Sequence, residues 1–212
     1  MSSISLKNTS GNAITLQSST SLSADVTLTL PVNDGDSGQY LQTDGAGALS
    51  WQTIATPTNI TVGTAADLTS QGSIVYSNIP SGTKRITVLI SGLSMTANTY
   101  RPTVRIGSGG STVSTGYVGR TAYNTAATSP TTGFEIYFWG VSGNALSTIM
   151  TIENVDGNTW VESHVGGSAG WGTVQYGSFD ITLGGTLDTL ELTTTSTGTF
   201  AQGTVNVYYE AA

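Results

Sequence analysis

Residues 84–91 read KRITVLIS, and this run carries the clearest strand pattern in the chain. Ile86, Val88 and Ile90 occupy alternate positions, so in an extended conformation they share one face, while Arg85 and Leu89 lie on the other. A period of two is the pattern of a β-strand that packs one face against a core. The run therefore predicts a β protein.

Runs of the same kind recur along residues 54–212. GFEIYFWGV (133–141) and GTVNVYYE (203–210) alternate in the same way, and no helical period of 3.6 is sustained over three turns. The pattern predicts strands at 59–62, 73–77, 84–91, 103–107, 116–123, 133–141, 147–155, 159–165, 174–183, 187–194 and 203–210. Short strands separated by turn residues predict an all-β domain, an antiparallel β-sandwich of jelly-roll type.

The composition agrees with a β protein that assembles. Only 9% of the 212 residues are charged, compared with about a quarter in typical soluble domains. Thr, which favours strands, and Ser and Gly, which favour turns, fill the difference. A β-rich chain of low charge is prone to pair through its strand edges, so we expect an oligomer or larger assembly to cover them.

Several function classes are disfavoured by what the sequence lacks. It has no cysteine, so it offers neither a disulfide framework nor a thiolate metal site, and we expect no metal and no cofactor. The start, MSSISLKNTS, does not resemble a secretory signal, and no run approaches the about 18 apolar residues of a spanning helix. We expect no membrane partner and synthesis in the cytoplasm of the producing cell.

Charge is unevenly distributed along the chain. Residues 68–134 carry five basic side chains and no acidic one, whereas residues 135–212 carry eight acidic side chains and no basic one. Five cations spread over 37 residues of an acidic protein make a poor phosphate-binding surface, so we expect no nucleic-acid partner. The pattern instead predicts basic strands that pair with acidic strands within one sandwich.

Residues 1–53 differ from the rest and predict a separate assembly element. Short alternating runs at 4–6, 14–16 and 26–30 are too brief to bury more than two or three side chains each. Such strands need partners, and three copies around one axis would supply them. The prediction is therefore an N-terminal trimerisation and docking element (1–53) followed by a displayed sandwich (54–212).

The end of this element, LTLPVNDGDSGQYLQTDGAGALSW (28–51), predicts a tight hairpin. Pro31 should end the third run, NDGDSG supplies turn residues, and DGAG (44–47) joins the strands YLQT and ALSW. Trp51 is expected to be buried against another subunit or the following domain. The candidate assembly residues are Leu28, Leu30, Tyr40, Leu41, Leu49 and Trp51.

Two parts of the chain resemble bacteriophage tail-fibre sequences. The first is similar to a recurring virion motif matched here by Leu30, Pro31, Gly38, Gln39, Leu41, Thr43, Asp44, Gly45, Leu49, Ser50 and Trp51. The second, residues 79–210, resembles a C-terminal tail-fibre domain in IPSGTKRITVLISGLS, RIGSGG, TGYVG, GFEIYF, TWVES, GTLDTLELTTT and TFAQGTVNVYYE. Together these matches cover most of the chain.

The resemblance implies a non-enzymatic structural protein of the phage particle, a short trimeric tail fibre or tail appendage that contributes to host attachment. Its implied partners are further copies of itself, other virion proteins of the tail or capsid, and a host cell-surface glycan. Because only about 50 residues precede the globular part, an alternative is a capsid decoration (cement) or head-fibre protein that stabilises the shell.

Residues capable of catalysis form no convincing constellation. His164 and Glu162 share a strand face, which a surface or cross-strand hydrogen bond explains as well as an acid–base pair does. The acid pairs nearest in sequence, Glu153 with Asp156 and Asp188 with Glu191, are interpreted as turn and strand-face residues rather than as glycosidase carboxylates.

Two short motifs are interpreted as loops. ENVDGN (153–158) has oxygen side chains like a calcium loop but lacks the distant glutamate, so we expect a hairpin turn at Asp156 and Gly157. GSGG (107–110) lacks the Lys-Ser/Thr ending of a phosphate loop and is interpreted as a strand connection.

Aromatic residues are numerous for a chain of such low charge. Rings flanked by Asn, Thr and Gly suit sugar binding, although Tyr and Trp are also common in cores and subunit interfaces. The loop GSAGWGTVQYG (167–177) presents the best candidate. The candidate ligand residues are Trp171, Tyr176 and Tyr117.

Overall fold

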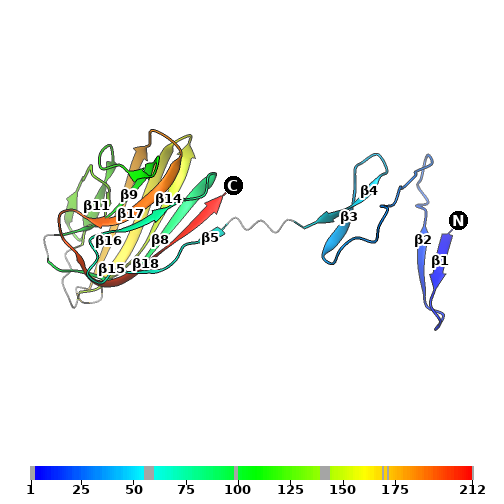
Figure 1. Ribbon diagram of the computed structural model, residues 1–212, viewed down its shortest axis with the longest axis horizontal. Helices are drawn as coiled ribbons and strands as arrows, with labels where there is room; N and C mark the ends of the chain where they lie inside the picture. The colour runs from blue at the N-terminus through cyan, green and yellow to red at the C-terminus, as the bar shows by residue number, and fades with distance from the viewer. Residues whose placement is uncertain are drawn as a thin grey trace. The chain divides into compact units, whose positions relative to one another are not determined.

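The chain consists of two compact units, Met1–Pro57 and Thr58–Ala212, drawn in Figure 1. The structure, a computed structural model, describes residues 3–54, 60–97, 100–138, 144–168, 170 and 172–211. Within these ranges the regular elements are all strands, and their ladders are antiparallel. The all-β prediction is confirmed. No helix of the described residues is long and apolar enough to cross a bilayer.

The first unit contains two separate hairpins. Strand β1 (Ser3–Lys7) pairs with β2 (Ala13–Gln17), and β3 (Gln39–Thr43) pairs with β4 (Leu49–Thr53). The strand predicted at 26–30 is wrong, because only Thr29 forms a bridge, to Ala48. Ala48 lies in the turn before β4, so the contact does not extend into a ladder.

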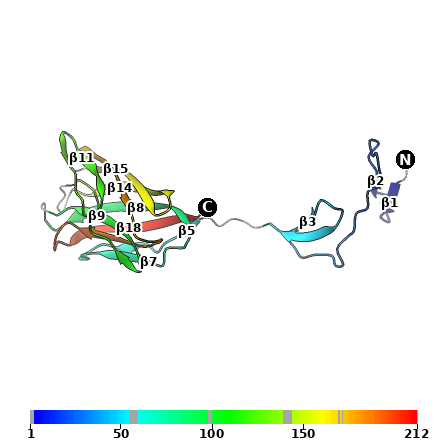
Figure 2. The ribbon, with the colours of Figure 1, turned by 90° about the horizontal axis from the view of Figure 1, so that it is seen from above.

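The second unit is built from a large and a small sheet. Their strands are β5 (Ile60–Val62), β6 (Ala66–Asp67), β7 (Ile74–Ser77), β8 (Thr83–Met95), β9 (Pro102–Ser108), β10 (Ser111–Thr112), β11 (Val118–Tyr123), β12 (Ala126–Thr128), β13 (Phe134–Glu135), β14 (Leu146–Asp156), β15 (Thr159–Ser168), β16 (Thr173–Thr182), β17 (Leu187–Thr194) and β18 (Phe200–Ala211). The large sheet has the order β12-β11-β16-β15-β14-β8-β18-β5, with β6 also on β18. The small sheet has the order β10-β9-β17-β7, with β13 on β9. Strands β8 and β18 run side by side in both views (Figures 1 and 2).

Most predicted strands of this unit are confirmed, because their alternation matches the observed burial. The prediction at 133–141 was too long: the strand covers only Phe134–Glu135, and residues 139–141 lie outside the described ranges. Strands β6, β10 and β12 were not predicted. Each has two or three residues, too few to show a period.

One hydrophobic core joins the two sheets. Ile86 and Val88 of β8 are fully buried in the same cluster as Ile106 of β9 and Leu190 of β17. Phe134 lies within this core, and its ring meets the edge of another buried aromatic ring at a centroid distance of 4.9 Å. The inward face of KRITVLIS is therefore the face that the sequence predicts.

The predicted pairing of basic with acidic strands is confirmed. Every cation in the four pairs below comes from residues 84–105, and every acid comes from residues 135–210. The pairs are Arg85–Glu153 (2.9 Å), Arg85–Glu210 (3.2 Å), Arg101–Glu135 (2.7 Å) and Arg105–Glu191 (3.9 Å). Three of them are direct cross-strand neighbours, which explains how the separate charge blocks partly offset each other in one fold.

The predicted hairpin at Asp156 and Gly157 is also confirmed. It connects β14 to β15, and Gly157 has a positive φ of 50°. The side-chain amide of Asn154 donates to the carbonyl oxygens of Gly157 and Thr159, which closes the turn.

Candidate functional site

The β3–β4 hairpin is closed by one carboxylate. Asp44 Oδ1 accepts hydrogen bonds from the backbone N–H groups of Ala46, at 2.8 Å, and Ala48, at 3.0 Å. This is the side-chain-to-backbone bonding that makes Asp a turn residue. The DGAG segment therefore forms the predicted turn, and the register places Leu41 opposite Trp51.

The indole of Trp51 packs within its own unit. Its Nε1–H donates to the carbonyl oxygen of Asn33 at 2.9 Å, and a Cβ added to Gly35 would lie 2.6 Å from the ring. Gly35 has a φ of 74°, so glycine is required there both for its conformation and for space. The structure thus gives Trp51 a partner in the NDG turn, which the sequence reasoning did not anticipate.

The six candidate assembly residues divide into two groups. Leu49 and Trp51 are half-buried in the hairpin, whereas Tyr40 and Leu41 are exposed. Leu28 and Leu30 flank the single bridge and are 60% and 69% exposed, in a chain segment with no core of its own beneath them.

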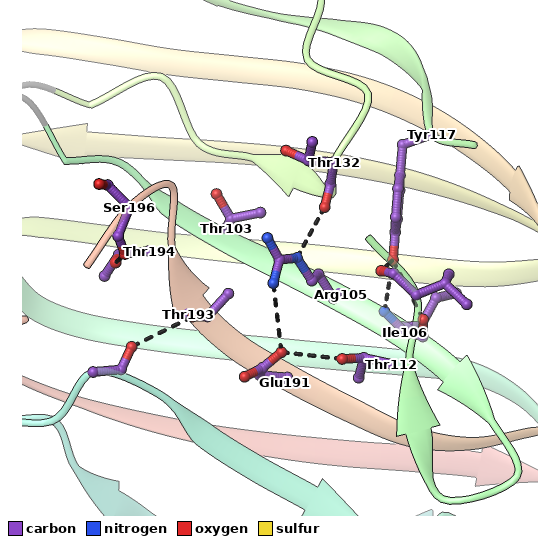
Figure 3. Close-up of polar contacts among 12 residues, drawn as sticks. Thr103, Arg105, Ile106, Thr112, Tyr117, Thr132, Glu191, Thr193, Thr194 and Ser196 are labelled. Atoms are coloured by element: carbon purple, nitrogen blue, oxygen red, sulfur yellow. Dashed lines mark hydrogen bonds and ion pairs between the residues drawn. The ribbon is translucent and has the colours of Figure 1, made fainter. Parts of the chain in front are cut away.

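Tyr117 is not a surface residue, and the prediction that it contacts a ligand is wrong. Its side chain is fully buried, and its ring meets Phe134 edge to face. The hydroxyl accepts from Ile106 N–H at 2.9 Å and lies 3.2 Å from the carbonyl oxygen of Val113 (Figure 3). Burial raises the pKa of Tyr117 to about 12. The residue ties the chain after β10 to strand β9.

The other two candidate ligand residues have different outcomes. Tyr176 lies on the outward face of β16 and is 54% exposed. Trp171 lies outside the described residues. The structure therefore places one of the three candidate rings on the surface.

His164 and Glu162 form a pair inside the fold rather than at the surface. His164 Nδ1 lies 2.7 Å from Glu162 Oε1, both side chains have no exposed area, and His164 Nε2 lies 3.3 Å from Thr121 Oγ1. On the inward face, Glu162 stands between Ile152 and Phe179. Burial raises the pKa of Glu162, an effect that its hydrogen bond to His164 opposes.

Three of the four carboxylates considered for glycoside hydrolysis make structural contacts, and the first of them, Glu153, pairs with Arg85. Glu191 accepts from Thr112 Oγ1 at 3.0 Å and lies beside Arg105 (Figure 3). Asp188 accepts from its neighbour Thr189, which lowers its pKa, and also from the N–H of Gly110. The latter bond anchors the GSGG segment as a strand connection.

Parts of strands β15 and β16 reverse the usual pattern of a half-buried sheet, although Trp160, Phe179 and Ile181 still face the core. In β15, Glu162 and His164 face the core while Val161 and Val165 face outward. In β16, Gln175 is buried while its neighbours on the outward face are exposed. Sequence reasoning missed these outward apolar residues because it assigned apolar side chains to the core by default. The available signal was the Glu-x-His spacing, which requires both polar groups to share a face.

A hollow lies on the outward face of the large sheet. Its volume is about 680 Å³, and Leu89, Ile149, Val165 and Val174 are among its lining residues. The remaining lining residues are small or uncharged. Within the described ranges, no group of three His, Asp or Glu side chains is placed to hold a metal ion.

Comparisons with known proteins give no relative for this chain: no protein-family model matches it, and neither a curated protein nor a solved structure is significantly similar to it.

Proposed function

We propose that the second unit is a jelly-roll β-sandwich. Eight of its strands, taken in chain order, are β5, β7, β8, β9, β13, β14, β17 and β18. Strand β5 pairs with β18, β7 with β17, β8 with β14 and β9 with β13, so the first strand meets the last and the pairs nest inward. This nesting is the order expected when two Greek keys roll into two facing sheets. Strands β15, β16, β11 and β12 then extend one sheet.

We propose further that the chain is a non-enzymatic structural protein of a phage particle, a short trimeric tail fibre or tail appendage. The virion-like motif of residues 30–51 supports this, because its turn residues form a hairpin that presents apolar side chains. A jelly roll supports it as well, since this architecture is common in capsid and lectin domains.

The observation that carries the proposal is the exposure of Leu28 and Leu30 beside a hairpin that has no core beneath it. Burying a leucine completely stabilises by about 1.5–3 kcal/mol, so covering the exposed parts of both would contribute about 2–4 kcal/mol per copy. Isolated two-stranded ribbons are marginal in water, so further copies of the chain would order this unit. The first unit is therefore the proposed trimerisation and docking element.

Sedimentation velocity on the full chain tests the assembly. We expect a trimer, and we expect the double variant Leu28→Ser, Leu30→Ser to dissociate. Val155→Ser is the matched control, because Val155 is equally exposed but lies in the second unit, beside the β14–β15 turn. A wild-type chain that stays monomeric at all concentrations would contradict the proposal.

The position on the particle separates the two structural functions. Antibodies against the chain should label phage tails if it is a fibre or appendage. Labelling of heads, together with capsids that become fragile when the protein is deleted, would favour a decoration (cement) or head-fibre protein. Particles without label would refute both.

A host cell-surface glycan is the proposed external partner. Tyr176 is the described candidate ring that a sugar could reach. Because weak contacts multiply with copy number, Tyr176→Ala should reduce binding of the assembled protein to host cells, and sedimentation velocity on the variant separates this effect from a change in assembly. Unchanged cell binding would remove Tyr176 from the receptor surface.

A further inference from the structure

We propose that the outward face of the large sheet is a second contact between copies of this chain. The contact is an apolar patch made by Leu89, Ile149, Val165 and Val174, which we call the outer patch. This inference extends the self-association of the proposed function to the second unit. It does not depend on the chain being a phage protein.

The outer patch is continuous because its members are neighbours in the strand register. Ile149 pairs with Leu89 on one side and with Val165 on the other. Val174 pairs with Gly167, the next outward residue of β15 after Val165. Side chains opposite each other on neighbouring strands lie about 4.5–5.5 Å apart, so these residues form one apolar surface. Ile149, Val165 and Val174 are each more than half exposed.

On strand β15 beneath this patch, polar side chains face the core and apolar side chains face outward. Val165 faces outward while the adjacent His164 faces the core, where its partner is Glu162. A sheet with one face in water normally places apolar residues inside and polar residues outside. A contiguous exposed apolar patch on such a sheet marks an interaction site.

The distribution of charge selects the partner. The hollow over the patch has no charged residue in its lining, and Arg85, Glu153 and Glu210 lie together along one border of the same face. Interfaces between proteins have this arrangement, with charge depleted at the centre and present at the rim. Because each copy carries a net charge of −7, two copies repel each other less when they meet through a neutral surface.

The area of the patch points to a sister copy rather than an independent partner. The patch residues lie on the four neighbouring strands β8, β14, β15 and β16, and about six residues along each would cover about 400 Å² per copy, or about 800 Å² for two. Stable interfaces bury about 1,200–2,000 Å² in total, so the patch alone is too small for a lasting complex. A copy already held by the first unit is at high effective concentration, and for such a partner a small contact is sufficient.

The test uses the full chain and two exposed valines. Val165→Glu places a charge in the centre of the outer patch, whereas Val75→Glu places one on strand β7 of the small sheet at similar exposure. We expect Val165→Glu to raise the concentration at which the oligomer dissociates by at least about tenfold, and Val75→Glu to leave it unchanged. Circular dichroism melting confirms that both variants remain folded.

A second readout is the labelling rate of a single introduced cysteine, which is specific because the natural sequence contains none. In the oligomer, a single cysteine introduced by Ile149→Cys should react with a maleimide at least about tenfold more slowly than one introduced by Val75→Cys, because only the former is covered. Binding of the apolar dye bis-ANS to the oligomer should likewise be weak.

The outcomes separate this inference from the proposed function. A chain that is monomeric throughout would overturn both. Dissociation by Leu28→Ser, Leu30→Ser but not by Val165→Glu, or equal labelling of the two cysteines, would overturn only the outer patch. Protection of Ile149→Cys in whole particles but not in the purified oligomer would assign the patch to a different protein and so refute a sister copy.

Discussion

Replacing Tyr117 by Phe removes one oxygen atom from the interior of the second unit. In the folded protein that oxygen accepts a hydrogen bond from Ile106 N–H at 2.9 Å. The carbonyl oxygen of Ile106 keeps another partner, because Val113 N–H donates to it at 3.1 Å. The carbonyl oxygen of Val113, 3.2 Å from the hydroxyl, also loses a donor, but the costliest loss is the buried N–H group left without an acceptor. The edge-to-face contact with Phe134 needs only the ring and should survive.

The expected cost follows from this single loss. A buried donor without a partner destabilises a protein by about 1–3 kcal/mol. For a domain of 150–250 residues, each kcal/mol lowers Tm by about 2–4 °C, so Tyr117→Phe should melt about 2–12 °C below the wild type. Tyr176→Phe should melt like the wild type, because its hydroxyl group lies on an exposed residue.

Thermal unfolding followed by circular dichroism measures this difference. Host-cell binding by the folded variant should be unchanged, because Tyr117 is inaccessible. If Tyr117→Phe melts within a degree of the wild type, the buried hydroxyl does not hold strand β9. If it remains fully stable but loses cell binding, the ring is a ligand residue after all.

Two further predictions concern the buried acid and the hairpin turn. Because burial raises the pKa of Glu162 above its ordinary value of about 4.5, the stability it contributes is present at low pH and is lost as pH rises through the folded-state pKa. Urea titrations of the wild type at increasing pH should therefore show a fall in unfolding free energy, and Glu162→Gln, which can still accept from His164, should flatten that fall; equal slopes for the two proteins would contradict this. Gly35→Ala should shift the indole N–H resonance of Trp51 in ¹H–¹⁵N spectra, because the new Cβ meets the ring. Gly38→Ala, with a similar positive φ but open space around it, should not, and identical spectra for the two variants would refute the packing.

The sequence by itself determined the local structure. Alternation in KRITVLIS set which face of β8 is buried, and Asp156 with Gly157 set the turn between β14 and β15. Separate basic and acidic blocks also predicted that basic strands pair with acidic ones, and the structure supplies the individual pairs, such as Arg105 with Glu191. These features depend on neighbours in the chain or on the overall distribution of charge, so the sequence reveals them directly. In the candidate assembly element, the exposed leucines could be identified in the same way.

Only the tertiary structure decided which polar side chains are buried although the sequence pattern places them at the surface. Tyr117 looked like a surface ring, but the backbone N–H of Ile106 on another strand donates to its hydroxyl oxygen, so the hydroxyl can be buried. Glu162 turns inward because His164 meets it there, and the valines beside them must then face outward. A polar group can enter a core only when a partner is in reach, and such partners come from segments far apart in the sequence. No local period contains that information.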